Sequence, residues 1–300
     1  MKPVRETGLE WRNSFWAGRF MAMGSPCEVL TESGDKTEAQ DLLDFVAAEA
    51  WRIEDKFSRY VPGNIVDQIN SGNGAPVAVD DETANLIDFA NALYELSDAR
   101  FDITSGVLRR VWTFDGGDRV PTAKDVARVL DTVGWSGVTW KRPLLIIRPG
   151  MQIDFGGIGK EYAVDLAAEH LKANCNASCL VNFGGDLVVT RPPESPERWQ
   201  VGIDALGDDS NRADRLIRLQ QGALATSGDA RRFVLKNGVR YGHILDPTTG
   251  WPVTDAPRSI TVAADTCTQA GMLATLAMLK GAGAERFLEQ QDIQFWCMRQ

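Results

Sequence analysis

A glycine-rich segment in the middle of the chain constrains the fold more than any other stretch. It reads Asp154-Phe-Gly-Gly-Ile-Gly-Lys-Glu-Tyr-Ala-Val-Asp165 and follows two short apolar runs, at 144–148 and 151–153. Apolar residues then recur at helical spacing over Glu161–Ala173, which predicts a strand, a glycine turn and a helix start. The free N–H groups and positive dipole of a helix start suit phosphate. A tight turn also needs glycine for its backbone angles alone, and the segment matches neither G-x-G-x-x-G nor a P-loop.

Composition limits which ligands and partners such a phosphate site could bind. The 300 residues are 44% hydrophobic and 24% charged, which is typical of an ordinary globular protein with one large domain or two small ones. The net charge is −9 and no long Lys/Arg run occurs, which argues against a nucleic-acid partner. A phosphate ligand would therefore be held by local groups: helix ends, a few cations or a metal ion.

Cysteine and histidine are too sparse to predict a zinc site. The chain has five cysteines and two histidines, and Cys175-x-x-x-Cys179 lacks a second ligand pair at metal spacing. We interpret the cysteines as mostly buried, reduced thiols. No signal-peptide core and no run of transmembrane length occurs, so we expect a cytoplasmic protein without a membrane segment.

The chain pattern predicts an α+β fold. Residues 1–17 are interpreted as an N-terminal arm and residues 18–300 as one domain. Helical periodicity runs over 38–57, 81–99, 123–133 and 268–279. Short strands alternate with turns between 178 and 264, including a hairpin across Asn237-Gly238. Antiparallel strands with a few helices predict a mostly antiparallel sheet with flanking helices.

Polar residues stand beside glycines at several predicted strand ends. Taken singly, each is typical of an Asx turn or a hairpin corner. Because each carries an aspartate, together with the first glycine segment they predict one convergent site. The segments are Phe101-Asp-Ile-Thr104, Asn182-Phe-Gly-Gly-Asp186, Thr226-Ser-Gly-Asp229 and His243-Ile-Leu-Asp-Pro-Thr-Thr-Gly250.

Taken in order, these segments resemble the ApbE family, the flavin transferases that move FMN from FAD onto Thr or Ser of a protein. Met23-Gly24-Ser25 and Phe57-Ser-Arg-Tyr60 with Ile69-Asn70 extend the likeness, which covers roughly residues 20–285. The resemblance implies a single α+β unit with an FAD cleft and Mg²⁺ at the pyrophosphate. It also implies that an acceptor hydroxyl attacks the FMN phosphorus and that AMP leaves.

The resemblance further implies roles for individual residues. His243, Asp229 and Lys160 would be catalytic, with His243 handling a proton and Lys160 contacting phosphate. From the residues alone, His243 could equally be a hairpin histidine, and Lys160 a surface lysine. Met23 and Tyr60 would stack on planar rings. The FAD-binding set would be Met23, Tyr60, Asp102, Thr104, Gly157, Lys160, Asn182, Gly185, Asp186, Thr226, Ser227 and Asp246.

The chain departs from the family at the implied metal site. The family carries an Asp on the C-terminal helix, four residues before a Thr; here those positions are Gly271 and Thr275. Mg²⁺ prefers anionic oxygen and would bind poorly without a carboxylate. Glu161 stands where the family usually has glycine, so the expected ligands are Glu161, Thr275 and the backbone of Gly159. The alternative is that Glu161 is only a favourable acid in a helix first turn.

Three activities therefore remain open from the sequence. The first is an FAD:protein FMN transferase acting on a Thr or Ser of an acceptor flavoprotein. The second is Mg²⁺-dependent hydrolysis of FAD to FMN and AMP in the same cleft. The third is a non-catalytic FAD-binding protein, which the missing aspartate would allow.

Overall fold

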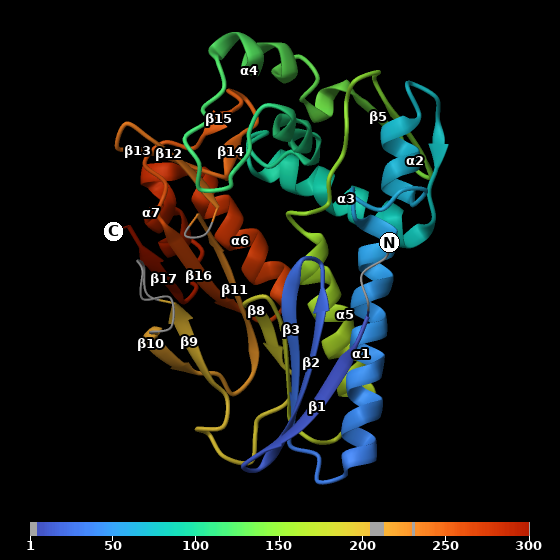
Figure 1. The fold of residues 1–300 in the computed structure, drawn as a ribbon, viewed down its shortest axis with the longest axis vertical. Helices are drawn as coiled ribbons and strands as arrows, with labels where there is room; N and C mark the ends of the chain where they lie inside the picture. Colours follow the sequence, from blue (N-terminus) through green and yellow to red (C-terminus); the bar gives the residue numbers. More distant parts are fainter. Residues whose placement is uncertain (1–4, 205–212, 230–231, 300) are drawn as a thin grey trace.

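The computed structural model describes residues 5–204, 213–229 and 232–299, and a large antiparallel sheet organises them (Figure 1). Its eight strands lie in the order β1-β2-β3-β7-β8-β11-β16-β17, and every neighbouring pair is antiparallel. This confirms the α+β prediction. The strands are β1 Thr7–Arg12, β2 Phe15–Ala22, β3 Ser25–Thr31, β7 Cys179–Phe183, β8 Asp186–Val189, β11 Gly222–Gly228, β16 Ser259–Ala264 and β17 Phe295–Met298.

The interpretation of residues 1–17 as an arm needs correction. Residues Thr7–Arg12 form the edge strand β1 and pair along their whole length with β2. The boundary expected after residue 17 falls inside β2, where Ala17 is buried. Trp11 and Trp16 meet across the two strands, with ring centroids 5.0 Å apart. The described part of this segment therefore belongs to the main sheet.

Three helices cover one face of this sheet and form the main core with it. Helix α1 (Lys36–Phe57) begins at the N-cap Asp35, whose side chain accepts from two backbone N–H groups. It lies beside α5 (Gly159–Asn174), and α5 lies beside α6 (Cys267–Leu279) (Figure 1). The helical patterns predicted over 38–57 and 268–279 are thus confirmed. Helix α6 packs on β11 and β16 and is buried along most of its length.

A second core lies on the opposite face of the sheet, under the hairpin of β9 (Gln200–Asp204) and β10 (Ala213–Arg218). Trp199 is buried there against leucines of β7, β8 and β11. Residues 205–212, between these two strands in the sequence, lie outside the described residues. None of the helices that the structure describes has both the length and the apolar surface to cross a lipid bilayer.

The remaining elements gather at one end of the sheet (Figure 1). The helix predicted over 81–99 ends at Leu96, because Asp98 and Ala99 adopt positive φ angles of 54° and 66°. The hairpin across Asn237-Gly238 is confirmed, and both residues have the positive φ of a type I′ turn. The elements are α2 Ile65–Ser71, β4 Val77–Ala78, α3 Asp81–Leu96, η1 Ile103–Arg110, α4 Ala123–Leu130, η2 Trp135–Gly137, β5 Val138–Lys141, β6 Leu144–Ile147, β12 Phe233–Lys236, β13 Val239–Gly242, β14 Leu245–Asp246, β15 Trp251–Pro252, η3 Gly281–Gly283 and α7 Ala284–Glu289.

The segment before the glycine turn is held by a side chain instead of by a neighbouring strand. Strand β6 ends at Ile147, and residues 151–155 are assigned to no strand, contrary to the predicted strand before the turn. Asn70 takes the place of a partner strand. Its Oδ1 accepts from the N–H of Ile153 at 2.7 Å, and its Nδ2 donates to the Ile153 carbonyl at 3.0 Å. One amide from α2 thus holds Ile153 on both sides, and the Asp154 N–H, which donates to the Ile103 carbonyl at 2.8 Å, holds the next residue.

Replacing Asn70 with alanine should therefore destabilise the protein. Ile153 is buried, so its N–H and carbonyl would lose their partners where water reaches them poorly. Each unsatisfied buried group costs about 1–3 kcal/mol, so for two groups we expect the free energy of unfolding to fall by about 4 kcal/mol. Chemical denaturation of the two proteins measures it. Asn70→Asp, which keeps the acceptor but loses the donor, should give a smaller loss. An unchanged free energy of unfolding in Asn70→Ala would contradict this role.

Candidate functional site

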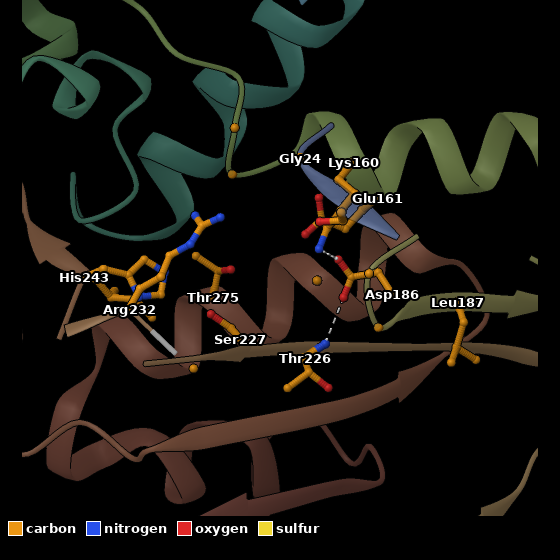
Figure 2. Close-up of a pocket in the computed structure, with 18 of the residues that line it drawn as sticks. Gly24, Lys160, Glu161, Asp186, Leu187, Thr226, Ser227, Arg232, His243 and Thr275 are labelled. Atoms are coloured by element: carbon orange, nitrogen blue, oxygen red, sulfur yellow. Dashed lines mark hydrogen bonds and ion pairs between the residues drawn. The ribbon is translucent and has the colours of Figure 1, made fainter. Parts of the chain in front are cut away.

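A cavity of about 1850 Å³ opens at the end of the large sheet where α5 begins. It gathers most of the residues that the sequence predicted for the site (Figure 2). Five predicted residues lie outside its lining: Met23, Thr104, Gly159, Asp229 and Asp246. The predicted residues that line it are Tyr60, Asp102, Gly157, Lys160, Glu161, Asn182, Gly185, Asp186, Thr226, Ser227, His243 and Thr275.

An ion pair between Lys160 and Asp186 lies at the centre of the labelled residues (Figure 2). Lys160 Nζ lies 2.7 Å from Asp186 Oδ2, and the Thr226 N–H donates to Asp186 Oδ1 at 3.1 Å. Asp186 is only 2% exposed, so its charge needs these partners. Burial lowers the pKa of Lys160, but the charge of Asp186, its hydrogen bond to Lys160 and the charge of Glu161 together raise that pKa above its ordinary value. Lys160 is therefore a cation on the cavity wall, already paired with an acid.

The turn between β7 and β8 shapes the neighbouring wall. Gly184 and Gly185 adopt positive φ angles of 63° and 100°, and the Gly185 N–H donates to Asn182 Oδ1 at 2.8 Å. A Cβ on Gly184 would lie 2.7 Å from Ser25 Cβ. Glycine is thus required at 184 by both conformation and space. Asn182 fixes this turn, which brings Asp186 to the cavity.

His243 lies across the cavity from Lys160, next to Arg232 (Figure 2). Burial, followed by the positive charge of Arg232, lowers the pKa of His243 to about 4. Its Nδ1 is buried and makes no hydrogen bond with any described residue. The imidazole is therefore neutral near pH 7 and has a lone pair for a proton.

Asp229, predicted as catalytic, is held in ion pairs away from the cavity lining. Its carboxylate lies 3.1 Å from Arg240 Nε and 2.8 Å from Arg258 Nε. These contacts join β11, β13 and the segment before β16. The negative charge of Asp229 still acts on His243, where it offsets a small part of the lowering of the pKa. In this structure the Asp229 carboxylate is paired with the two arginines and lies outside the cavity lining.

Three further predicted residues have structural roles. Asp102 caps the 3₁₀ helix η1 through the Thr104 N–H at 2.8 Å, and also accepts from the Trp135 N–H at 2.8 Å. The Thr104 hydroxyl accepts from the Gly134 N–H, so both residues clamp the 134–135 segment onto η1. Burial raises the pKa of Asp102. Asp246 closes the turn at 246–250 through the Thr248 N–H and hydroxyl.

Of the two residues predicted to stack on planar rings, Tyr60 lines the cavity and Met23 does not. Tyr60 is 74% exposed on the cavity wall, and its hydroxyl accepts from Arg109 at 2.7 Å. The Arg59 guanidinium lies over its ring at 5.6 Å. Met23, in contrast, turns away with a φ of 50° and donates its N–H to Glu54. Met21, two residues earlier, lines the cavity and is 59% exposed.

Arginines on the cavity wall are the main residues that sequence reasoning missed. Arg59 stands inside the Phe57–Tyr60 segment and binds the Gly106 carbonyl and Asp154 at 2.8 and 3.2 Å. The others belong to no recognisable pattern and reach the cavity only through the fold. Together they offset the acidic balance of the chain where a phosphate ligand would bind. The cavity arginines are Arg19, Arg59, Arg100, Arg109 and Arg232.

Glu161 lies one residue beyond Lys160 (Figure 2). Its side chain faces Gly271 of α6. Its Oε2 is buried and makes no hydrogen bond with any described residue. Burial, followed by the charge of Asp186, raises the pKa of Glu161 to about 8. Thr275, one turn further along α6, also lines the cavity. Among the described residues, no three His, Cys, Asp or Glu side chains form a metal-binding group. A cation here would therefore need hydroxyl, backbone or ligand oxygens as well.

Comparison with known proteins gives a consistent result. The sequence model of the ApbE family matches residues 23–297. The FAD:protein FMN transferase of Vibrio cholerae is 29% identical over 251 residues, which cover 82% of this chain and 73% of that protein. An ApbE protein from Thermotoga maritima has a similar structure, with a TM-score of 0.83, 32% identity and 94% of both chains covered. The apo flavinyl transferase ApbE of Pseudomonas stutzeri gives 0.80 and 28%, covering 99% of this chain and 92% of that one.

Proposed function

Because this chain belongs to the ApbE family, we propose that it is an FAD:protein FMN transferase. It takes FAD as its substrate and attaches FMN to a Thr or Ser hydroxyl of an acceptor protein. The observation that carries this proposal is the single cavity that gathers the family-like segments. Its volume exceeds the roughly 300–1000 Å³ of common small-molecule pockets and suits a dinucleotide.

The distribution of groups in the cavity fits phosphoryl transfer. The acceptor oxygen would attack the FMN phosphorus, the bond to the AMP oxygen would break, and AMP would leave with the electron pair. Lys160 and the cavity arginines lower the electrostatic cost of the charge on the phosphates. The neutral imidazole of His243 lines the same cavity and would accept the proton of the acceptor hydroxyl. Tyr60 offers an exposed ring for stacking on the flavin or the adenine.

We infer that Mg²⁺ assists this reaction. The buried, unpartnered oxygen of Glu161 fits a hard cation, and the Thr275 hydroxyl belongs to a residue that lines the same cavity. Glu161, Thr275 and the backbone of the glycine turn would hold the ion. When bound, it would neutralise charge on the pyrophosphate.

One incubation tests the proposed activity against its two alternatives. The purified protein is mixed with FAD, Mg²⁺ and an acceptor protein, and the products are separated under denaturing conditions. AMP together with flavin that stays on the acceptor supports the transferase. AMP with free FMN would identify a hydrolase, and FAD recovered intact would identify a binding protein. An acceptor whose target Thr is replaced by Ala is the matched control and should stay free of flavin.

A further inference from the structure

We propose that Glu161 supplies the carboxylate of a divalent-cation site and that Gly271 is the complementary gap that admits it. The two residues belong to different helices, α5 and α6, and meet at the cavity wall. The inference deepens the proposed function, because it names which side chain of this chain faces the cation. The cation site can be tested independently of FMN transfer, because cation binding is measured without an acceptor protein.

Glu161 occupies the volume that a side chain at position 271 would need. A Cβ built on Gly271 would lie 2.6 Å from Glu161 Cγ, 2.8 Å from Oε1 and 3.1 Å from Cδ. Real Cβ atoms do not come that close to carbon or oxygen, so the backbone or Glu161 would have to move. Only one of the two helices can therefore place a carboxylate at this point. In this chain that helix is α5.

A second contact fixes the helices in this register. Asp165, one turn after Glu161, accepts from the backbone N–H groups of Cys267 and Thr268 at 2.7 and 2.8 Å. Asp165 thus satisfies free donors at the start of α6. The two helices run antiparallel. The residue one turn before Asp165 in α5 therefore lies next to the residue one turn after Cys267 in α6. Glu161 is thereby placed opposite Gly271, with Thr275 a further turn along.

One oxygen of the Glu161 carboxylate, the buried Oε2, is left without a protein partner among the described residues. The neighbouring Lys160 ammonium is already bound to Asp186 at 2.7 Å. A buried anionic oxygen without a donor or cation is costly. The missing partner of Glu161 Oε2 points to a hard divalent ion, Mg²⁺ or Mn²⁺, which takes carboxylate, hydroxyl and backbone oxygens as ligands.

Binding of Mn²⁺ to the protein without FAD tests this inference, followed by electron paramagnetic resonance of the free ion. Glu161→Gln keeps the size of the side chain and removes its charge. We expect it to weaken Mn²⁺ binding by more than the roughly tenfold to hundredfold loss typical of an outer-shell change. Glu169→Gln, an exposed acid two turns further on α5, is the matched control and should bind Mn²⁺ as the wild type does.

The exchange variant Glu161→Gly with Gly271→Asp gives the sharper result. It moves the carboxylate to α6 and removes the side chain that fills the space there, so Mn²⁺ binding should return toward the wild-type value. Wild-type affinity in Glu161→Gln would overturn the proposal. So would a folded exchange variant that binds no better than Glu161→Gln. Thermal unfolding in EDTA shows which variants are folded. A wild-type protein that binds Mn²⁺ but transfers no FMN would refute the proposed function and leave the cation site standing.

Discussion

Replacing His243 with alanine should lower the rate of FMN transfer by about 10²- to 10⁴-fold, the contribution typical of a general base. The imidazole lines the cavity and is neutral near pH 7, so it can accept the proton of the acceptor hydroxyl. FAD binding should persist, because Lys160, the arginines and Tyr60 remain. Single-turnover transfer and flavin fluorescence measure the two properties separately. His170→Ala is the matched control: it removes the other histidine, which stacks on Phe45 outside the cavity lining.

The pH dependence gives an independent check on His243. Its pKa is lowered to about 4 by burial and by Arg232, so the reactive neutral form persists well below pH 6.5. As pH falls through about 4, the imidazole becomes protonated and kcat/KM should drop. An acidic limb near the ordinary histidine value would show that His243 is not the group titrating. A rate in His243→Ala close to that of the wild type would remove it from the mechanism.

Lys160→Met should destabilise the protein by about 3 kcal/mol, near the lower end of the cost of breaking a buried ion pair. Methionine keeps most of the aliphatic stem but leaves the carboxylate of Asp186, which is nearly inaccessible, with only the Thr226 N–H as a partner among the described residues. The Lys160 side chain is 28% exposed, which limits the loss. Urea unfolding without FAD measures it. FAD affinity should fall as well, because a cation is lost from the cavity wall.

A double substitution shows whether the lost stability comes from the broken ion pair or from the packing of the Lys160 side chain. Lys160→Met combined with Asp186→Asn removes both charges, and we expect it to recover part of the lost stability. Lys172→Met lies on the same helix at an exposed position and should leave the free energy of unfolding nearly unchanged. Equal stability of Lys160→Met and the wild type would show that Asp186 does not depend on Lys160.

The regular part of the fold followed from periodicity, but the edge of the sheet did not. The long apolar stripe of α1 and the Asn-Gly turn of β12–β13 are local signals, and both are confirmed. Strand β1 is short, half-exposed and rich in polar residues, so its pattern resembles that of a mobile arm. Residues 151–153 are predicted to be a strand because Met151 and Ile153 are apolar and alternate with Gln152. Their actual partner is the Asn70 side chain, which no strand pattern predicts.

The candidate site was predictable where glycine and aspartate share a turn. Asn182, Gly185 and Asp186 meet Lys160 because the β7–β8 turn and the start of α5 converge, as the motif order implied. Asp229 and Asp246 belong to similar motifs, yet they hold turns and arginines in place outside the cavity lining. A motif shows that an aspartate is needed but not which way its side chain faces. Apart from Arg59, the cavity arginines belong to no motif, so only the fold revealed them.

The most direct test of the proposed transferase is the ratio of AMP released to FMN bound covalently to the acceptor. Both are measured in the same reaction with FAD and Mg²⁺, AMP by chromatography and FMN by the intact mass of the acceptor. Transfer forms one phosphoester bond for each pyrophosphate bond broken, so the account predicts equal amounts throughout the time course. AMP accumulating while the mass of the acceptor stays unchanged would contradict it.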